Sequence, residues 1–412
     1  MIKKIFNKLK SKDGKTILEN FVSLSAIQMV AMVLPLITLP YVLRVIGFEK
    51  YGIIVFASSL ISYFTSLTDF SFKITGVRDV AVFKHSPKKL NIIYSKIITV
   101  KTIFLIVSIL LISSIVLLYP AFYEYKIIYF LSMLSLVGNV LFPEWFFQGI
   151  EKMRYITYLN ISIKVFFFFC IFVFIKNEED YWIYPLLQSL GTIGAGIVGQ
   201  FLLVKKYRLK LLLLPKKIII STIKSNFPIF VNQFLPTLYN NTSVFLLGIF
   251  DSKAMVGMYQ AILTFVNLGI TVVEILSRVF FPYLNRKKDA FTSYKKMMLI
   301  IVSIIGIGLL MANRIIFWYL NIEDPNAFWI LLALVIGLFG YALSNIYGLN
   351  YFIIHRQDKL VMKNTLRASI IGFILAFPLV STFGVLGTAI NLSFSRWMMG
   401  GGLFYKYLKR LK

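Results

Sequence analysis

Long uninterrupted runs of apolar residues alternate with short polar segments along almost the whole chain. Nine of these runs contain no charged side chain: 21–43, 51–68, 102–123, 127–143, 181–204, 225–250, 254–273, 297–313 and 325–355. Two further runs carry a single cation each, 155–175 with Lys164 and 368–405 with Arg396. Because an apolar helix of about 20 residues crosses the hydrocarbon core of a bilayer, the pattern predicts a series of membrane-spanning helices.

The last run, 368–405, is long enough for two crossings. Ser381-Thr382-Phe383-Gly384 offers a turn in its middle, so we expect two helices there and twelve spans in total. The distribution of Lys and Arg supports an even number of spans. With the N-terminus in the cytoplasm, 35 of the 44 Lys and Arg residues fall in cytoplasmic segments and only five on the opposite side. Because such an excess of cytoplasmic cations orients membrane proteins, both termini are expected in the cytoplasm.

Composition agrees with a membrane protein. Of the 412 residues, 58% are apolar and 15% are charged, whereas soluble domains contain about 45–50% apolar and roughly 25% charged residues. The single cysteine, Cys170, has no partner for an intrachain disulfide. The net charge of +27 lies mostly between the apolar runs, so we attribute it to membrane orientation and expect no nucleic-acid partner.

Spans one and seven have asparagine, proline and glycine at similar positions, which suggests that the chain consists of two related halves. Asn20-Phe21 opens the first and Asn226-Phe227 the seventh, each contains two prolines, and Gly52 and Gly257 follow at matching places. Proline-broken polar helices at matched positions point to a transport site between halves, although proline is also tolerated as a simple kink. We predict an N-terminal six-helix bundle over 1–204, a cytoplasmic linker over 205–224 and a C-terminal six-helix bundle over 225–412.

Two short segments are predicted to contact membrane lipids without spanning the bilayer. Residues 1–16 alternate apolar and basic side chains and form a basic amphipathic N-terminus, which suits an anionic lipid surface. Leu211–Ile220 is too short to span and is interrupted by Pro215-Lys216-Lys217. It is expected to lie along the cytoplasmic interface.

Several motifs carry a resemblance to a known family. They are Leu36–Gly47, Asp69-Phe70-Ser71-Phe72 with the following Gly76–Ala81, Pro143–Met153 with its Trp145-Phe146-Phe147-Gln148-Gly149 core, and Phe383–Ala389. The chain resembles the O-antigen and polysaccharide flippases of the multidrug/oligosaccharidyl-lipid/polysaccharide exporter superfamily. It departs from that family at Ser71, where glycine is usual and would suit a tight turn.

The resemblance implies an all-α integral membrane protein with 12 transmembrane helices in two pseudo-symmetric six-helix bundles around a central cavity. It implies a non-enzymatic transporter that works by alternating access in the bacterial inner membrane. Its cargo would be an undecaprenyl-pyrophosphate-linked oligosaccharide repeat unit of O-antigen, and thus of lipopolysaccharide, or of a related surface polysaccharide, moved from the cytoplasmic to the outer leaflet. A polysaccharide polymerase and chain-length proteins are the expected partners.

Cations are the first candidates for binding such a cargo, because charges inside a span are costly and usually functional. The substrate-binding candidates with positive charge are Arg44, Arg78, Lys164, Arg278 and Arg396. Four of them have a structural alternative. Lys164 can extend to the interface, Arg44 can anchor at headgroups, Arg278 can form an ion pair with Glu274 four residues earlier, and Arg78 can belong to a charge network that locks one conformation.

Polar and acidic side chains complete the candidate set. Gln233, Asn240 and Asn241 make span seven unusually polar, which is explained equally by sugar contact and by hydrogen bonds between helices. Asp69, Glu144 and Glu274 are candidates for coupling to a proton or Na⁺ gradient. No catalytic residue, cofactor or metal site is expected, since the two histidines, His85 and His355, have no ligand spacing around them.

Two other classes of protein fit the sequence less well. A membrane-embedded polysaccharide polymerase or glycosyltransferase needs a sizeable outward loop with catalytic side chains, whereas the outward loops here are only a few residues long. A small-molecule or cation exporter of the same superfamily favours acidic cavities. Here the cations within the predicted spans outnumber the acids, which favours an anionic cargo.

Overall fold

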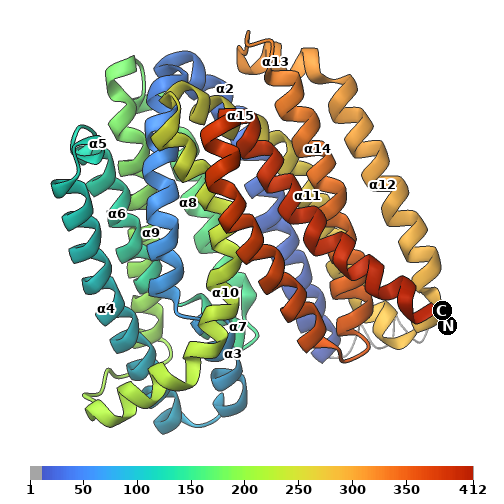
Figure 1. Cartoon of the computed structure of the whole chain (residues 1–412). Coiled ribbons are helices and arrows are strands. Elements are labelled where there is room, and N and C mark those ends of the chain that lie inside the picture. Colours follow the sequence, from blue (N-terminus) through green and yellow to red (C-terminus); the bar gives the residue numbers. More distant parts are fainter. Residues whose placement is uncertain (1–11, 412) are drawn as a thin grey trace. The chain divides into compact units, whose positions relative to one another are not determined.

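The computed structural model describes residues 12–411, which form helices with no strand among them. The helices are α2 (Lys12–Asp69), α3 (Phe72–Phe83), α4 (Pro87–Leu118), α5 (Pro120–Tyr123), α6 (Lys126–Leu141), α7 (Glu144–Gly149), α8 (Met153–Phe174), α9 (Ile183–Lys205), α10 (Lys216–Phe250), α11 (Lys253–Arg286), α12 (Phe291–Met311), α13 (Asn313–Leu320), α14 (Ala327–Leu343) and α15 (Asp358–Leu411) (Figure 1). Short 3₁₀ turns η1 (Glu178–Trp182) and η2 (Lys288–Ala290) and a π-helix η3 (Ser344–Ile353) connect them. Residues 1–11, with most of the predicted amphipathic N-terminus, lie outside the described part.

Within that part, nine helical stretches are long and apolar enough to cross a membrane. Two of them, Met32–Phe83 and Asp358–Arg410, have twice the length of one crossing. Each is broken at a glycine with positive φ, Gly47 at 74° and Gly384 at 51°, a conformation that glycine adopts without a steric penalty. Gly384 lies in the predicted turn. The structure confirms an all-helical membrane architecture, and the count of twelve spans stays a prediction.

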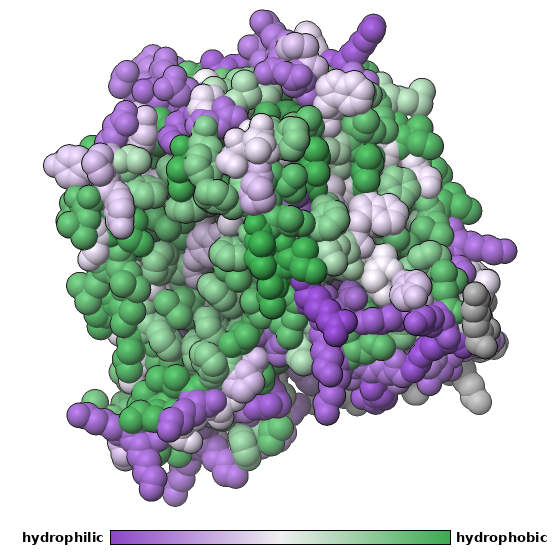
Figure 2. Space-filling view, in the orientation of Figure 1, coloured by the Kyte–Doolittle hydropathy of each residue, from purple (hydrophilic) through white to green (hydrophobic). Residues whose placement is uncertain are grey.

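The surface of the first helices suits a lipid environment. α6 packs against both α4 and α9, and the outer side of α4 carries exposed aliphatic side chains such as Ile106, Leu110 and Leu118. In the left part of Figure 2, hydrophobic residues fill the middle of this face and hydrophilic residues gather at its two ends. Apolar side chains exposed in such a band are stable next to acyl chains rather than water.

The chain forms two compact units that are discontinuous in sequence. Among the described residues, unit 1 comprises 12–34, 61–176 and 182–233, and unit 2 comprises 35–60, 177–181 and 234–411. α2 and α10 therefore contribute to both units. The units do not coincide with the two sequence halves, whose boundaries stay a prediction. The predicted linker 205–224 is coil only up to Pro215, because α10 begins at Lys216.

The core of unit 1 joins two of the family motifs. Trp145, Phe146 and Phe147 of α7 are at most 1% exposed. A β-carbon added to Gly149 would lie 2.6 Å from that of Val80 on α3, and one added to Gly76 would lie 3.3 Å from the β-carbon of Trp145. The glycines of each motif thus make room for the large side chains of the other.

In unit 2, residues 48–57 cross the start of α11 at very short range. A β-carbon on Gly52 would overlap the carbonyl oxygen of Lys253, and one on Gly257 would overlap the carbonyl oxygen of Phe48. The Lys253 ammonium lies 4.1 Å from the centre of the Phe56 ring, within cation–π range. The two glycines noted in the sequence are therefore the contact point of this crossing.

Candidate functional site

Arg396 on α15 is a buried cation without an acidic partner. Only 7% of the residue is exposed, and one terminal guanidinium nitrogen has no hydrogen-bond partner. Throughout residues 12–411, no carboxylate forms an ion pair with it. Its electrostatic neighbours are instead three tyrosines, Tyr239 of α10, Tyr259 of α11 and Tyr341 of α14. We call these four residues the tyrosine cage.

The cage is possible because small residues let the helices approach. A β-carbon on Gly340 of α14 would lie 2.7 Å from the backbone of Arg396. One on Gly372, in the first leg of α15, would overlap the Ser395 hydroxyl and lie 3.1 Å from the β-carbon of Tyr239. Glycine in helical membrane proteins commonly permits such contact. Close packing therefore keeps the arginine out of lipid and places it against aromatic rings.

A short polar chain leads from the cage to the surface of unit 2. The guanidinium carbon of Arg396 lies 5.8 Å from the centre of the Tyr341 ring. The Tyr341 hydroxyl donates a hydrogen bond to Glu274 of α11 at 2.5 Å, and Glu274 also pairs with Arg278 at 3.4 Å. The predicted i,i+4 pair is thus present. The chain contains two arginines and one glutamate, so it retains a net positive charge.

Further polar groups near the cage lack partners. The Asn391 amide donates to the Ser243 hydroxyl at 2.7 Å and to the Gly372 carbonyl at 3.0 Å. Its carbonyl oxygen and the Ser395 hydroxyl are buried with no hydrogen-bond partner. Buried polar atoms are normally hydrogen-bonded. The interior of unit 2 around Arg396 therefore has unused capacity to bind a polar ligand or water.

Unit 1 contains a separate charge cluster around Asp69. The Asp69 carboxylate accepts hydrogen bonds from Lys73 at 2.8 Å and from Lys101 at 3.3 Å. Lys101 is 2% exposed and also donates to the Asn139 carbonyl at 2.9 Å. Glu144 contributes its negative charge to the electrostatic environment of both lysines. α4 thus places the Lys101 side chain in the interior of unit 1, next to Asp69.

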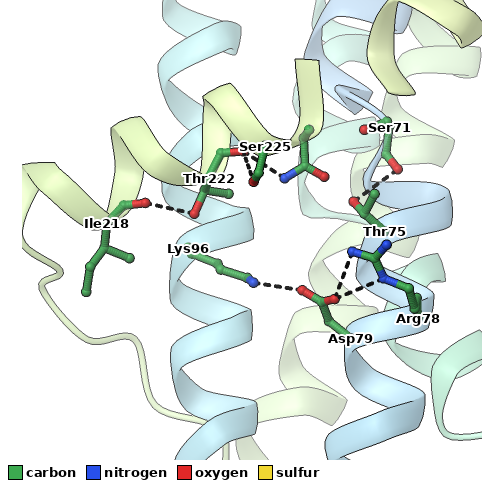
Figure 3. Close-up of polar contacts among 9 residues, drawn as sticks. Ser71, Thr75, Arg78, Asp79, Lys96, Ile218, Thr222 and Ser225 are labelled. Atoms are coloured by element: carbon green, nitrogen blue, oxygen red, sulfur yellow. Dashed lines mark hydrogen bonds and ion pairs between the residues drawn. The ribbon is translucent and has the colours of Figure 1, made fainter. Parts of the chain in front are cut away.

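Arg78 lies on α3 in a second, more exposed ion-pair group (Figure 3). Its guanidinium is 3.4 Å from Asp79, whose other carboxylate oxygen is 2.7 Å from Lys96 of α4. The Arg78 side chain is 65% exposed. This group links α3 to α4, and Arg78 at its edge keeps donors available to solvent.

The remaining candidates are dispersed. Arg44 is exposed and Lys164 is half-buried, and neither forms a hydrogen bond or ion pair with another residue of the described chain. On α10, Gln233 and Asn240 are exposed and Asn241 is half-buried. The Asn240 amide donates to the Pro236 carbonyl one turn earlier at 3.0 Å. The structure thus unites Arg278, Glu274 and Arg396 in unit 2 and Asp69 with Glu144 in unit 1.

The sequence alone does not identify the three cage tyrosines as site residues. Each lies in an apolar run in which tyrosine is indistinguishable from ordinary aromatic packing. No local spacing connects residues on three different helices. The part of the chain in the structure contains no group of three or more His, Cys, Asp or Glu side chains suited to holding a metal ion.

Solved structures define the class of fold. The chain is similar to a structure described as the inward-facing conformation of a multidrug resistance MATE family transporter of the MOP superfamily. The TM-score is 0.68 at 11% identity, over 95% of this chain and 98% of the other. It is also similar to a MATE crystal structure in the bent conformation, with a TM-score of 0.56 at 13% identity over 99% and 97%. The fold is therefore that of these multi-pass membrane transporters.

Sequence comparison gives the family. The family model described as "Polysaccharide biosynthesis protein" matches residues 17–288, and the chain belongs to that family. Two curated relatives, each named "Putative O-antigen transporter", match over most of their length. The one from Escherichia coli (strain K12) is 27% identical over 384 residues, which are 90% of this chain and 92% of the relative. The one from Shigella dysenteriae is 24% identical over 371 residues, 88% and 92% respectively.

Proposed function

We propose that this protein is a flippase that moves lipid-linked oligosaccharide repeat units of a surface polysaccharide across the membrane. The observation that carries the proposal is membership of the polysaccharide biosynthesis family over residues 17–288, in a chain with a MATE-like fold. The two O-antigen transporter relatives cover about nine-tenths of the chain. That fold suits transport by alternating access, since the related structures differ in conformation.

The orientation and partners follow from this role. The chain would lie in a bacterial inner membrane with both termini in the cytoplasm, an orientation that the distribution of Lys and Arg supports. The cargo would be an undecaprenyl-pyrophosphate-linked unit of O-antigen or a related glycan, received in the cytoplasmic leaflet and released in the outer leaflet. A polymerase and chain-length proteins would use the released unit.

The tyrosine cage supports an anionic head group as cargo. A buried charge is normally paired, yet Arg396 has no carboxylate partner in the described chain and one unused donor nitrogen. A pyrophosphate supplies the missing counter-charge and accepts charge-assisted, bidentate hydrogen bonds from a guanidinium. Tyr239 and Tyr259 are electrostatic neighbours of Arg396, and their rings would contact the sugar next to the bound pyrophosphate. Arg278 adds a second cation at the exposed end of the polar chain.

Glu274 is the acid best placed to couple transport to a proton or Na⁺ gradient. Asp69 is held between two lysines, so its charge is already compensated and costly to change. Glu274 keeps 31% of its side chain exposed and, among residues 12–411, forms an ion pair with Arg278 alone. Neutralising it would release both Arg278 and the Tyr341 hydroxyl, which changes the charge beside the cage.

Surface glycan in a strain whose own repeat-unit transporter is deleted tests the function. Expression of this chain should restore glycan made from a matching repeat unit, and Arg396→Gln should abolish it at unchanged protein level. Arg396→Lys should restore part of it, because the charge returns without the planar donors. Arg314→Gln, which removes an exposed arginine of the same unit, is the matched control and should act like the wild type. If the chain restored surface glycan with none of the tested repeat units, the proposed function would be contradicted.

A further inference from the structure

The linker between α9 and α10 presents aliphatic and basic side chains together on the surface of unit 1. Five large aliphatic side chains in it are exposed: Leu211, Leu212, Leu213, Ile218 and Ile220. Six exposed cations lie around them: Lys205, Lys206, Arg208, Lys210, Lys216 and Lys217. No Asp or Glu occurs between residues 205 and 220. We call the exposed side chains of 205–220 the linker surface.

The linker is fixed to the helices beneath it rather than hanging free. The Lys210 amide donates to the Asn91 side chain at 3.0 Å, and the Leu212 amide donates to the Ser95 hydroxyl at 2.8 Å. Leu209 is 3% exposed and belongs to the core of unit 1. The backbone is thus held up to Leu212, and the side chain of the next residue, Leu213, is fully exposed.

The same segment is anchored at its two ends. Tyr207 packs against Phe146 with ring centres 5.1 Å apart, and burial raises the pKa of its hydroxyl to about 12, so the linker carries only the charge of its lysines and arginines. At the other end Ile219 is buried. Figure 3 shows the coil entering α10, where the Thr222 hydroxyl bonds to the Ile218 carbonyl at 2.8 Å.

This combination excludes both bulk water and the hydrocarbon core as the environment. Irregular backbone exposed to lipid does not occur within the hydrocarbon region, and residues 208–215 are irregular. Aliphatic side chains surrounded by basic ones are typical of segments that lie in the plane of the membrane surface. Lysine and arginine there are attracted to anionic lipids.

We propose that the linker surface is a membrane anchor that binds the headgroups of anionic phospholipids, with Leu211, Leu213 and Ile218 inserted among the upper acyl carbons. The site faces the bilayer and needs no transported substrate. Its ligand class is an anionic glycerophospholipid, because residues 205–220 present six exposed cations and contain no Asp or Glu.

The test uses the full-length protein with Cys170→Ala and Leu213→Cys, labelled with an environment-sensitive fluorophore. Leu213 makes no buried contact, so the label does not disturb the core. The protein is placed in nanodiscs of phosphatidylcholine alone or with phosphatidylglycerol. The fluorescence of the label is quenched either by iodide in the water or by lipids that carry a nitroxide near the headgroup, and the two effects are compared. Glu124→Cys, an exposed position outside the linker, is the matched control.

With phosphatidylglycerol, iodide quenching of the label at position 213 should fall several-fold and nitroxide quenching should rise, with no change at position 124. Replacing Arg208, Lys210, Lys216 and Lys217 by Gln should remove the effect. Salt should weaken it too, because the screening length shortens from about 10 Å at 0.1 M to about 3 Å at 1 M. Equal iodide quenching in both nanodiscs would overturn the proposal. The proposal would also be overturned if soluble pyrophosphate displaced the linker surface from the lipid and restored iodide quenching, since that result identifies a diphosphate site instead.

Discussion

The backbone of Gly52 lies directly against the carbonyl oxygen of Lys253, so that no β-carbon fits between them. The two residues belong to α2 and α11, which are about 200 positions apart in the chain. Gly257 repeats the relationship one turn further along, against Phe48. A pair of backbones held this close allows little adjustment, because neither contact is with a flexible side chain.

Gly52→Ala should therefore destabilise the protein by about 1–3 kcal/mol or more, the range for overpacking a tight contact. The measurement is the thermal unfolding temperature of the purified protein in detergent. Gly308→Ala is the matched control in the same unit. A β-carbon there meets nothing within 4 Å, so it should be neutral or stabilise α12 by up to about 1 kcal/mol. Equal unfolding temperatures for both variants would contradict the close crossing.

Ser71→Gly should stabilise the protein by about 1 kcal/mol. Ser71 has a φ of 65°, where a side chain costs about 1–2 kcal/mol, and its buried hydroxyl has no hydrogen-bond partner. The greater freedom of glycine in the unfolded chain offsets part of the gain. An unfolding temperature lower than that of the wild type would show that the hydroxyl has a partner. Ser71→Ala separates the two effects, because it removes the hydroxyl and keeps the strain.

Lys101 and Asp69 should behave as a coupled pair. Lys101→Met leaves Asp69 with Lys73 alone, and Asp69→Asn leaves Lys101 buried without a carboxylate. Asp69→Asn should cost about 3–5 kcal/mol, because the charge of Lys101 stays unpaired in the interior. Lys101→Met should cost less, because Asp69 keeps its ion pair with Lys73. The double variant should lose less than the sum, which a double-mutant cycle of unfolding measures. Additive losses would contradict the pair. If Asp69 and Lys101 stabilise unit 1 and take no part in transport, the double variant should still support the synthesis of surface glycan.

Several features of the fold follow directly from the local sequence. The charge-free runs correspond to helices, the break at Gly384 lies in the predicted turn, and the residue where the family motif prefers glycine has a left-handed backbone. Each depends on neighbours within a few residues. The ion pair of Glu274 and Arg278 is of the same kind, since a spacing of four places both on one helix face.

The remaining features depend on contacts between distant segments. Residues 35–60 pack with 234–411, a pairing that hydropathy cannot reveal. Lys101 is buried because α4 packs against segments that carry its partners, Asp69 and the Asn139 carbonyl, which lie more than 30 positions away in the chain. The tyrosine cage draws Tyr239, Tyr259 and Tyr341 from three helices. For the same reason, the sequence identified Arg396 as a candidate but not its surroundings.

Arg396→Met should separate stability from transport. The arginine has one donor nitrogen buried without a partner, and such a group costs about 1–3 kcal/mol. Methionine fills a similar volume without that penalty, so the unfolding temperature should rise while surface glycan is lost. A structural arginine would give the opposite result for stability. Arg396→Lys, which keeps the charge, should recover some glycan and lose the added stability. A fall in the unfolding temperature of Arg396→Met would mean that the guanidinium holds the helices together, and the assignment of Arg396 to cargo binding would then fail.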